Sequence, residues 1–337
     1  MSATPVPQRR QRLQRSELAV PATSTRFLAK ARESEADVVF LDLEDAVTPR
    51  LKDEARRMAV EALAGDWGHR TMAVRINGLD TPWALEDIVA VATHAPRLDL
   101  VLLPKAGTAF DVRFVEHVLT LIERCHPRAE PVGIELLIET AQGLAHAEEI
   151  AAASPRLEAM IFGVGDYTVD MRTNDAVFGR PSERYAVLTQ PGADGQRALH
   201  WNDQWHYALA RIANACRANG LRAIDGPYTD FADPEGYRAC ARRAAALGFE
   251  GKWAIHPSQI AIANEVFSPG EAERAWAAQV LQALAEADAR GDGAVNASGV
   301  LVDLAHGKQA RLIDERVRLI EGRTARASRA DGRGGRG

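Results

Sequence analysis

The feature that most constrains the fold of this chain is a repeated alternation between short apolar runs and longer amphipathic stretches. Near-continuous apolar strands are typical of a parallel sheet that is buried on both faces. Eight strand–helix units of this length predict a closed (β/α)8 barrel, the TIM barrel, over residues 13–270. The eight apolar runs are ELAV, VVFLDLED, TMAVRIN, LDLVLLPKA, VGIELLIET, LEAMIFGVGD, LRAIDGPY and GKWAIHP.

The stretches between these runs have the period of a helix. In LKDEARRMAVEALAG, residues 51–65, apolar residues recur at i, i+3 and i+4 along one helical face. We expect Thr48 to cap this helix and Pro49 to occupy its first turn. Gly220 and Gly248 are expected to end two later helices. An open doubly wound sheet is the alternative fold, but no run leads into the Gly-x-Gly-x-x-Gly loop of a dinucleotide site.

The pattern changes after the eighth unit. Residues 271–322 predict a long helix, a Gly-rich hinge, a short strand-like turn and a second helix. We interpret this segment as a C-terminal lid or arm, and an arm that serves stability alone is the alternative. Residues 1–12 and the Arg- and Gly-rich residues 323–337 are predicted to be disordered.

Composition excludes several classes of protein. The net charge of 41 − 46 = −5 gives no general case for binding nucleic acid. Cys125, Cys216 and Cys240 are too few and too scattered for a disulfide framework or a zinc site, and they fit a reducing compartment. The N-terminal segment lacks the apolar core of a secretory signal, and no run approaches the roughly 20 residues of a membrane helix. We therefore expect a cytoplasmic protein with no membrane partner.

Polar residues follow seven of the eight predicted strands. In a barrel of this kind, such residues at the carboxyl ends of the strands are functional candidates, whereas residues at the other end support stability. The strand-end residues are Glu44, Asp45, Arg75, Asn77, Lys105, Glu139, Asp166, Asp225 and His256.

Glu139 and Asp166 end consecutive strands, so a barrel would make them neighbours. Two carboxylates held close together do not both stay ionised unless a cation lies between them. Paired carboxylates with open positions for water and substrate are the usual ligands of Mg²⁺, and neither strand end carries the His or Cys typical of zinc. Arg75 would lie across the barrel mouth, where a fixed guanidinium suits an enolate or carboxylate oxygen. These residues together indicate enolate chemistry on a carboxylated substrate.

At these residues the chain resembles a known family. The motifs ADVVFLDLEDAV, VRINGLDTPW, LLPKA, IELLIETAQGL, GVGDY, IDGPYTDFADPEGY and GFEGKWAIHPSQIAIANEVFSP occur in the order seen in the HpcH/HpaI aldolase, or citrate lyase β-subunit-like, superfamily. The run HWNDQWHYALARIANACRANGLRAIDGP and the motif GKWAIHPSQ resemble its malyl-CoA/β-methylmalyl-CoA lyase branch most closely. The resemblance covers residues 13–320.

The resemblance implies a TIM barrel, Mg²⁺ (with Mn²⁺ as an alternative ion) and a coenzyme A thioester substrate. It implies that Glu139 and Asp166 are the metal ligands and that Arg75 stabilises the enolate oxygen. Asp303, in LVD, resembles the general acid/base of the family, delivered from a neighbouring subunit of a homo-trimer or homo-hexamer. Glu44 and Asp45 are expected to orient Arg75 and metal-bound water.

The loop after the first strand departs from the family. It reads VPATSTRFLAKA, with Ala22 and Ser24 where the family commonly has Gly and Arg. We expect Arg26 and Lys30 to hold the coenzyme A phosphates instead. Pro257, in the motif IHP, is also assigned to coenzyme A binding by the resemblance.

The expected reaction is reversible cleavage of a 3-hydroxyacyl-CoA, such as L-malyl-CoA or β-methylmalyl-CoA, to glyoxylate and acetyl-CoA or propionyl-CoA. A malyl-CoA thioesterase and a citramalyl-CoA or citryl-CoA lyase are alternatives on the same scaffold. A catalytically silent scaffold that binds RNA through its Arg-rich tail is a more remote alternative.

Overall fold

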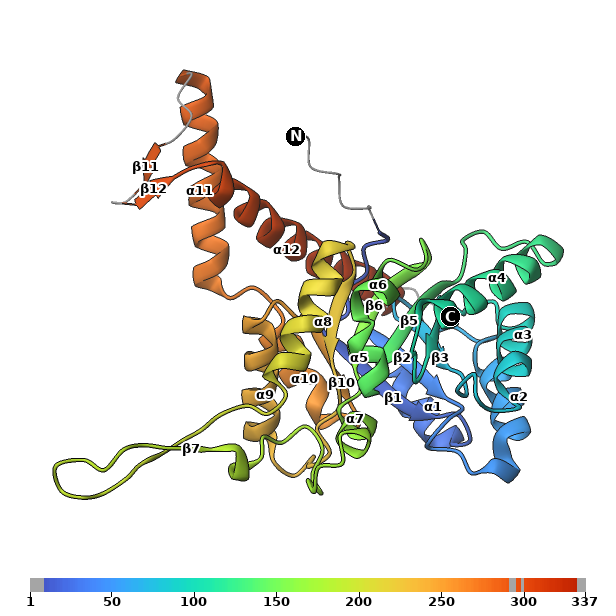
Figure 1. Cartoon of the computed structure of the whole chain (residues 1–337). Helices are drawn as coiled ribbons and strands as arrows, with labels where there is room; N and C mark the ends of the chain where they lie inside the picture. The colour runs from blue at the N-terminus through green and yellow to red at the C-terminus, as the bar shows by residue number, and fades with distance from the viewer. Residues whose placement is uncertain (1–8, 291–294, 298–299, 332–337) are drawn as a thin grey trace. The chain divides into compact units, whose positions relative to one another are not determined.

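The computed structural model describes residues 9–290, 295–297 and 300–331. These residues fall into two compact units, which divide between Asn264 and Glu265. The first unit contains a closed barrel of parallel strands in the order β1-β10-β9-β6-β5-β4-β3-β2, which confirms the predicted (β/α)8 barrel (Figure 1). Its strands are β1 (Ser16–Pro21), β2 (Val38–Asp42), β3 (Thr71–Arg75), β4 (Leu100–Leu103), β5 (Gly133–Ile138), β6 (Leu157–Phe162), β9 (Arg222–Asp225) and β10 (Gly251–Ala254).

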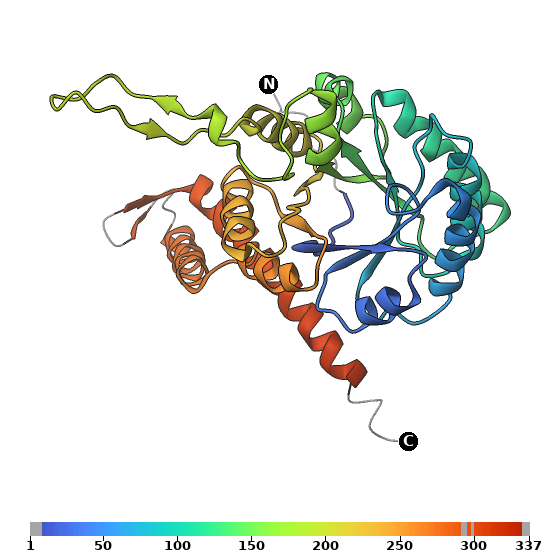
Figure 2. The ribbon, with the colours of Figure 1, turned by 90° about the horizontal axis from the view of Figure 1, so that it is seen from below.

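Helices surround the barrel, as Figure 2 shows. Each strand is followed by one helix or by a short succession of helices, which is the reason that neighbouring strands run parallel. The helices are α1 (Thr25–Arg32), α2 (Lys52–Ala62), α3 (Ala84–His94), α4 (Ala109–Cys125), α5 (Ala141–Ala145), α6 (Ala147–Ala151), α7 (Val164–Asp170), α8 (His206–Ala218), α9 (Pro234–Ala246) and α10 (Ser258–Val266), with 3-10 turns η1 (Pro49–Leu51) and η2 (Glu183–Tyr185).

The barrel interior follows the two-residue period of the strands. Phe40, Ala73 and Leu137 belong to one buried apolar cluster inside the barrel, and Phe40 packs on Trp253 with ring centroids 4.5 Å apart. Because alternate residues of a strand share a face, the residue two positions beyond each of these points into the same interior. The polar residues at the ends of β2, β3 and β5 therefore lie directly above this apolar layer.

Two of the expected helix boundaries are confirmed and one cap is wrong. Gly220 and Gly248 follow α8 and α9 with φ of 69° and 94°, which glycine adopts without steric penalty. Thr48 makes no side-chain capping bond, because the 3-10 turn η1 separates it from the first residue of α2 at Lys52.

The N-terminal segment differs from its predicted disorder from Arg9 onward. Arg9 donates to the Ser154 carbonyl at 2.9 Å, and Arg12 pairs with Glu158 at 2.8 Å and with Asp99 at 3.5 Å. The arginines of this segment thus find acceptors at the amino-terminal end of the barrel. Residues 1–8 lie outside the described residues.

The second unit is a pair of packed helices, α11 (Glu271–Arg290) and α12 (Leu304–Asp331), joined through the antiparallel strands β11 (Val295–Ala297) and β12 (Val300–Val302). Ala277, Val280 and Ala310 form its core. Gly307 allows the close approach, since a Cβ there would come within 2.6 Å of Leu284 Cδ1.

Helix α12 continues to Asp331, into the segment for which disorder is predicted. Its sequence TARASRAD is rich in Ala and Arg, which are strong helix formers, so a helix that has already begun can extend through it. Residues 332–337 lie outside the described part of the chain.

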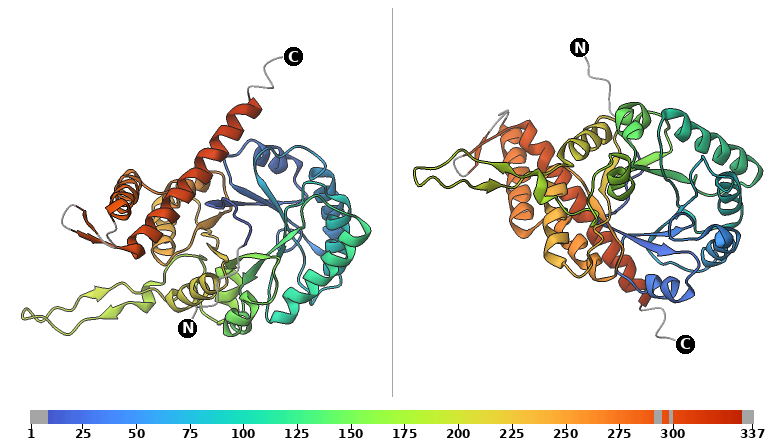
Figure 3. Two further views of the ribbon diagram at one scale, coloured as in Figure 1. Left: turned by 90° about the horizontal axis from the view of Figure 1, so that it is seen from above. Right: turned by 60° about the horizontal axis from the view of Figure 1, so that its bottom comes forward.

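A long connection between α7 and α8 carries a two-stranded hairpin, β7 (Val187–Leu188) with β8 (Leu199–His200). The hairpin projects from the barrel unit in Figure 2 and Figure 3, and the side chains of both strands are exposed. Within the described ranges, no helix has the length and apolar character needed to cross a bilayer.

Candidate active site

Arg75 ends β3 and is fixed by two carboxylates of the preceding strand and its loop. Its Nε and Nη2 atoms donate to the two oxygens of Asp42 at 2.7 and 2.6 Å, in a bidentate pair, and Nη1 lies 3.0 Å from Glu44 Oε2. The guanidinium also lies over the rings of Phe40 and Trp253, at 5.9 and 5.6 Å from their centroids. These contacts leave the buried Arg75 side chain essentially one orientation.

Arg75 and Asp42 each stabilise the charged form of the other. Burial by itself would lower the pKa of Arg75, but the adjacent Asp42 and Glu44 raise it above its ordinary value. Burial likewise works against the charge of Asp42, yet Arg75 and the backbone N–H groups of Glu44 and Ala46 hold its pKa below the ordinary value. Arg75 and Asp42 are therefore both charged at neutral pH.

Asp42, which was not among the expected partners, makes the bidentate contact with Arg75, and Glu44 makes a single contact at 3.0 Å. Asp45 Oδ2 is 3.8 Å from Arg75 Nη1, and the Asp45 side chain is 56% exposed. The alternation of β2 explains the difference, because Asp42 lies two positions after the inward-facing Phe40. Asp42 is paired with Arg75 in the register of β2 and β3, so the two side chains contact each other inside the barrel.

Glu139 follows β5 at the same end of the barrel. The residue is 2% exposed, and its Oε1 accepts the backbone N–H of Lys105 at 2.7 Å. Burial, together with the negative charges of Asp166 and Glu44, raises the pKa of Glu139 to about 8. A cation beside Glu139 would oppose each of these effects.

Asp166 lies in the first turn of α7, just after β6, which is the neighbour of β5 in the barrel. The sequence between strand and carboxylate contains Gly163, where a Cβ would come within 2.4 Å of Glu139 Oε2. Only glycine can therefore stand at position 163 while Glu139 keeps its place. The prediction that Glu139 and Asp166 come from adjacent strands agrees with this arrangement.

One cavity of about 470 Å³ contains the centre of this arrangement. It opens at the carboxyl ends of the barrel strands, where Phe178 and Val169 contribute apolar surface beside the charged groups. Its polar lining consists of Asp42, Asp45, Arg75, Glu139, Asp166 and Thr229.

The donor set of this cavity fits a hard divalent cation better than a softer one. Among the described residues, no group of three or more His, Cys, Asp or Glu side chains is placed to hold a metal ion. Two carboxylates, with the remaining positions left to water and substrate, suit Mg²⁺, which keeps several waters when it binds proteins. The raised pKa of Glu139, which reflects burial and the neighbouring negative charges, is consistent with that use.

The residues expected to bind coenzyme A lie on the outer surface near this end. Arg26 and Lys30 are exposed on α1, and Ser24 is used locally, since its side chain accepts the Phe27 N–H as the cap of that helix. Pro257 is exposed between β10 and α10. None of these residues lines the cavity that holds Arg75.

Asp303 belongs to the second unit. Its Oδ1 accepts the N–H groups of Ala305 and His306 at 2.9 and 3.2 Å, so it caps α12. His306 Nδ1 lies 2.8 Å from the same oxygen, and its hydrogen bond holds the pKa of the exposed Asp303 below the ordinary value.

Sequence reasoning missed Asp42 as a member of this cluster, and it named Lys105 as a candidate without giving it a role. Asp42 was hidden in the apolar run VVFLDLED, although its spacing from Phe40 was the available signal. Lys105 was a strand-end residue without an assigned role, and it pairs with Glu44 and lies 3.9 Å from Asp166 Oδ2.

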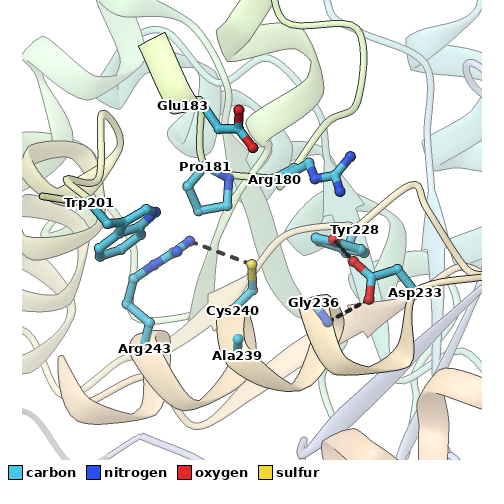
Figure 4. A pocket seen from close by; sticks show the side chains of 10 residues that line it. All are labelled: Arg180, Pro181, Glu183, Trp201, Tyr228, Asp233, Gly236, Ala239, Cys240 and Arg243. Atoms are coloured by element: carbon cyan, nitrogen blue, oxygen red, sulfur yellow. Dashed lines mark hydrogen bonds between the residues drawn. The ribbon is translucent and has the colours of Figure 1, made fainter. Parts of the chain in front are cut away.

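A second cavity, of about 520 Å³, is lined by residues of the long connection after α7 and of α9 (Figure 4). Arg180, Trp201 and Arg243 contribute to its lining, and Arg243 also pairs with Asp203 at 2.8 Å. This second cavity contains none of the predicted site residues.

The fold and the charged rim define a class of protein. It is a TIM-barrel enzyme with a cluster of carboxylates, of the kind that binds a cation, beside a fixed guanidinium. The family model of HpcH/HpaI aldolase/citrate lyase matches residues 15–257, and the chain belongs to this family.

Individual relatives are similar to this chain over most of its length. The chain is 46% identical over 308 residues, 91% of its length and 95% of the relative, to an L-malyl-CoA/beta-methylmalyl-CoA lyase of Cereibacter sphaeroides. It is 35% identical, over 88% of its length and 92% of the relative, to a (3S)-malyl-CoA thioesterase of the same species. The solved structure of protein CitE from Mycobacterium tuberculosis, in complex with magnesium, acetoacetate and coenzyme A, matches with a TM-score of 0.67 at 31% identity, over 90% of this chain and 98% of that one.

Proposed function

We propose that this chain is a Mg²⁺-dependent carbon–carbon lyase that reversibly cleaves a 3-hydroxyacyl-CoA, such as L-malyl-CoA or β-methylmalyl-CoA. The products are glyoxylate and acetyl-CoA or propionyl-CoA. The observation that carries the proposal is one cavity in which Glu139 and Asp166, from adjacent strands, share the lining with the fixed Arg75. The 46% identity to a lyase of that name supports the choice of substrate.

Glu139 and Asp166 would hold the ion, which when bound acts as a Lewis acid toward the oxygens of the hydroxy-acid or oxo-acid end of the substrate. Arg75 stabilises the thioester enolate, whose oxygen gains negative charge as the carbon–carbon bond breaks. Because Asp42 and Glu44 already orient the guanidinium, little reorganisation is needed during the reaction.

In the condensing direction Asp303 removes a proton from the α-carbon of the acyl-CoA. In the cleavage direction the proton released from the substrate hydroxyl passes through Asp303 to the enolate carbon. The depressed pKa of Asp303 keeps it ionised, as a base must be for the condensing direction. We propose that Asp303 reaches the cavity of a neighbouring subunit, in a homo-trimer or homo-hexamer. The exposed position of Asp303 at the start of α12 is compatible with this role.

Arg26 and Lys30 are the proposed partners of the coenzyme A phosphates, since both are exposed cations on α1, which follows the first barrel strand. Pro257 is proposed to contact the same carrier. A cytoplasmic location and the absence of a nucleic-acid partner are part of the proposal, supported by the net charge of −5 and by three free cysteines.

A malyl-CoA thioesterase is the second candidate function, which the 35% identity to a protein of that name favours. Water would then attack the thioester carbonyl, releasing free coenzyme A. The residues proposed for enolate and metal are common to both reactions, so geometry at the cavity does not separate them.

Product analysis separates the two functions. The purified chain is incubated with glyoxylate and acetyl-CoA, with propionyl-CoA or pyruvate as alternative substrates, in the presence of Mg²⁺ or of a chelator. Accumulation of malyl-CoA from these substrates is expected for the lyase. Malyl-CoA itself is supplied in a parallel incubation, in which release of malate and free coenzyme A indicates the thioesterase, because hydrolysis forms no carbon–carbon bond. Absence of any product under all conditions with Mg²⁺ would contradict both.

A further inference from the structure

Lys105 has a backbone conformation that is uncommon for a side chain of its kind. Its φ is 52°, in the left-handed region that glycine favours, at the turn that follows β4. In this conformation its N–H points at Glu139 and donates to Oε1 at 2.7 Å. An outlier of this kind at a functional site persists because surrounding contacts hold it, so it is a reason to look for a role.

The side chain of Lys105 supplies such contacts. Its Nζ atom donates to Glu44 and lies 3.7 Å from Asp45 Oδ1 and 3.9 Å from Asp166 Oδ2. One residue therefore reaches both predicted metal ligands, Glu139 through its backbone and Asp166 through its ammonium group. The side chain is 33% exposed, at the edge of the charged cluster rather than in the protein core.

The other cation of the cluster is committed elsewhere. Arg75 uses Nε and Nη2 on Asp42 and Nη1 on Glu44. Among the described residues, Lys105 is the cation with an ion-pair contact to Asp166, whose carboxylate is otherwise opposed by the charge of Glu139. A positive charge at this position lessens the mutual repulsion of the two carboxylates.

We propose that Lys105 is a positioning residue that holds Glu139 and Asp166 toward each other and sets the affinity of this pair for a divalent cation. The inference rests on the proposed function, because it takes these two carboxylates as the cation ligands. Lys105 acts in two ways: its N–H fixes the Glu139 oxygen, and its charge competes with the incoming ion for Asp166.

The charge of Lys105 is expected to weaken the binding of the divalent cation. Replacing the ammonium group by an uncharged chain of similar length removes a positive charge close to the bound ion. The ion carries two positive charges, and one nearby ammonium group repels them even in a well-solvated site. This repulsion corresponds to a change in metal affinity of about tenfold. Lys105→Met is therefore expected to bind Mg²⁺ about tenfold more tightly, whereas Lys105→Arg, which keeps the charge, stays close to the original affinity.

The test is calorimetric titration of the metal-free full chain with MgCl2, and with MnCl2 as a second probe. Lys105→Gly accompanies Lys105→Met, because glycine relieves the backbone strain at φ 52° while also removing the charge. Both variants are expected to show tighter binding. Arg57→Met is the matched control, since Arg57 is an exposed cation on α2 paired with Glu61, and its loss should leave the dissociation constant unchanged.

Unchanged or weaker binding in both Lys105→Met and Lys105→Gly would overturn the inference. An equal change in Lys105→Arg would overturn it as well, since a purely steric role would affect all three variants. The proposed function is tested separately by Asp166→Ala. If the unsubstituted chain and Asp166→Ala bind the ion equally, the metal site itself is wrong; if only the Lys105 variants fail to differ, the lyase proposal stands without this inference.

Discussion

At the scale of single residues, the candidate site is organised around Arg75 and the carboxylate that holds it. Asp42 and Arg75 are registered side by side on β2 and β3, and both are buried. A buried ion pair with bidentate geometry orients its members strongly, and removal of one partner leaves an uncompensated charge. The orientation of the proposed enolate-stabilising group therefore depends on Asp42 more than on the exposed Asp45.

Asp42→Asn is expected to lower both turnover and stability. The amide cannot neutralise the buried Arg75, so the free energy of unfolding should fall by about 3 kcal/mol. Asp45→Asn, at an exposed position 3.8 Å from the same guanidinium, should change stability by less than about 1 kcal/mol. Denaturant unfolding of both variants, with the coupled assay, compares them; equal losses in the two would contradict the assignment of Asp42.

Two further carboxyl groups are buried at the opposite end of the barrel, away from the cavity. Glu17 and Glu135 are fully buried, and both accept a hydrogen bond from the Gln14 amide, at 2.9 and 2.8 Å. Burial and the charge of Glu135 raise the pKa of Glu17 well above its ordinary value, and burial raises the pKa of Glu135 to about 7. Residues at this end of a barrel serve stability.

Stability should consequently decrease as the pH rises through this range. Between the ordinary value of 4.5 and about 7, the folded chain keeps protons that the unfolded chain has released, so the free energy of unfolding falls with increasing pH. Glu17→Gln, which is uncharged at every pH, should reduce this decline and should raise the free energy of unfolding at pH 8 by about 1 kcal/mol.

Denaturant unfolding between pH 5 and pH 8 measures this effect. Glu61→Gln is the control, because Glu61 is exposed on α2 and its pairing with Arg57 contributes little. A steeper decline for Glu17→Gln than for the unsubstituted chain would refute the role of the buried carboxyl pair.

At the scale of elements, α12 begins directly after the residue proposed as the acid/base. Asp303 caps the helix with the same oxygen that accepts from His306. An asparagine in its place would retain the capping bond but not the proton transfer, whereas an alanine would lose both.

Asp303→Asn should therefore keep the thermal midpoint and lose turnover by about 10²- to 10⁴-fold. Asp303→Ala should lose a similar factor and also melt at a lower temperature. Thermal unfolding followed by circular dichroism, together with the product assay, distinguishes the two contributions. Full activity in Asp303→Asn would remove Asp303 from the reaction.

At the scale of the whole molecule, the question is which subunit supplies Asp303. Under the proposal, Asp303 acts in the cavity of a neighbour, so the Asp166→Ala and Asp303→Asn variants have complementary defects. A mixed oligomer would contain cavities with an intact Asp166 from one chain and an intact Asp303 from the other. Such a cavity is complete although each parent variant is inactive.

Mixing the two inactive variants, after dissociation and reassembly, is therefore expected to restore part of the turnover. Mixing either variant with itself is the control and should restore none. Recovery should depend on total protein concentration, because subunit exchange is required. If the mixture stays inactive while size-exclusion chromatography shows reassembled oligomers, Asp303 does not act across subunits.

The sequence by itself determined the barrel, because the eight apolar runs and their intervening helices carry the strand and helix periods directly. It also indicated Arg75, Glu139 and Asp166, since any polar residue at the end of a buried strand in this fold must face the same rim. These conclusions need only local pattern and a known topology.

Only the tertiary structure decided the pairings. The preference of Arg75 for Asp42 over Asp45 depends on sheet register, and the hydrogen bond from the Lys105 N–H to Glu139 accompanies a left-handed backbone angle. The ordering of the N-terminal arginines depends on Glu158 and Asp99, which lie far away in sequence. Register, backbone angle and long-range ion pairs are set by how distant segments pack, and a residue pattern along one segment does not contain that information.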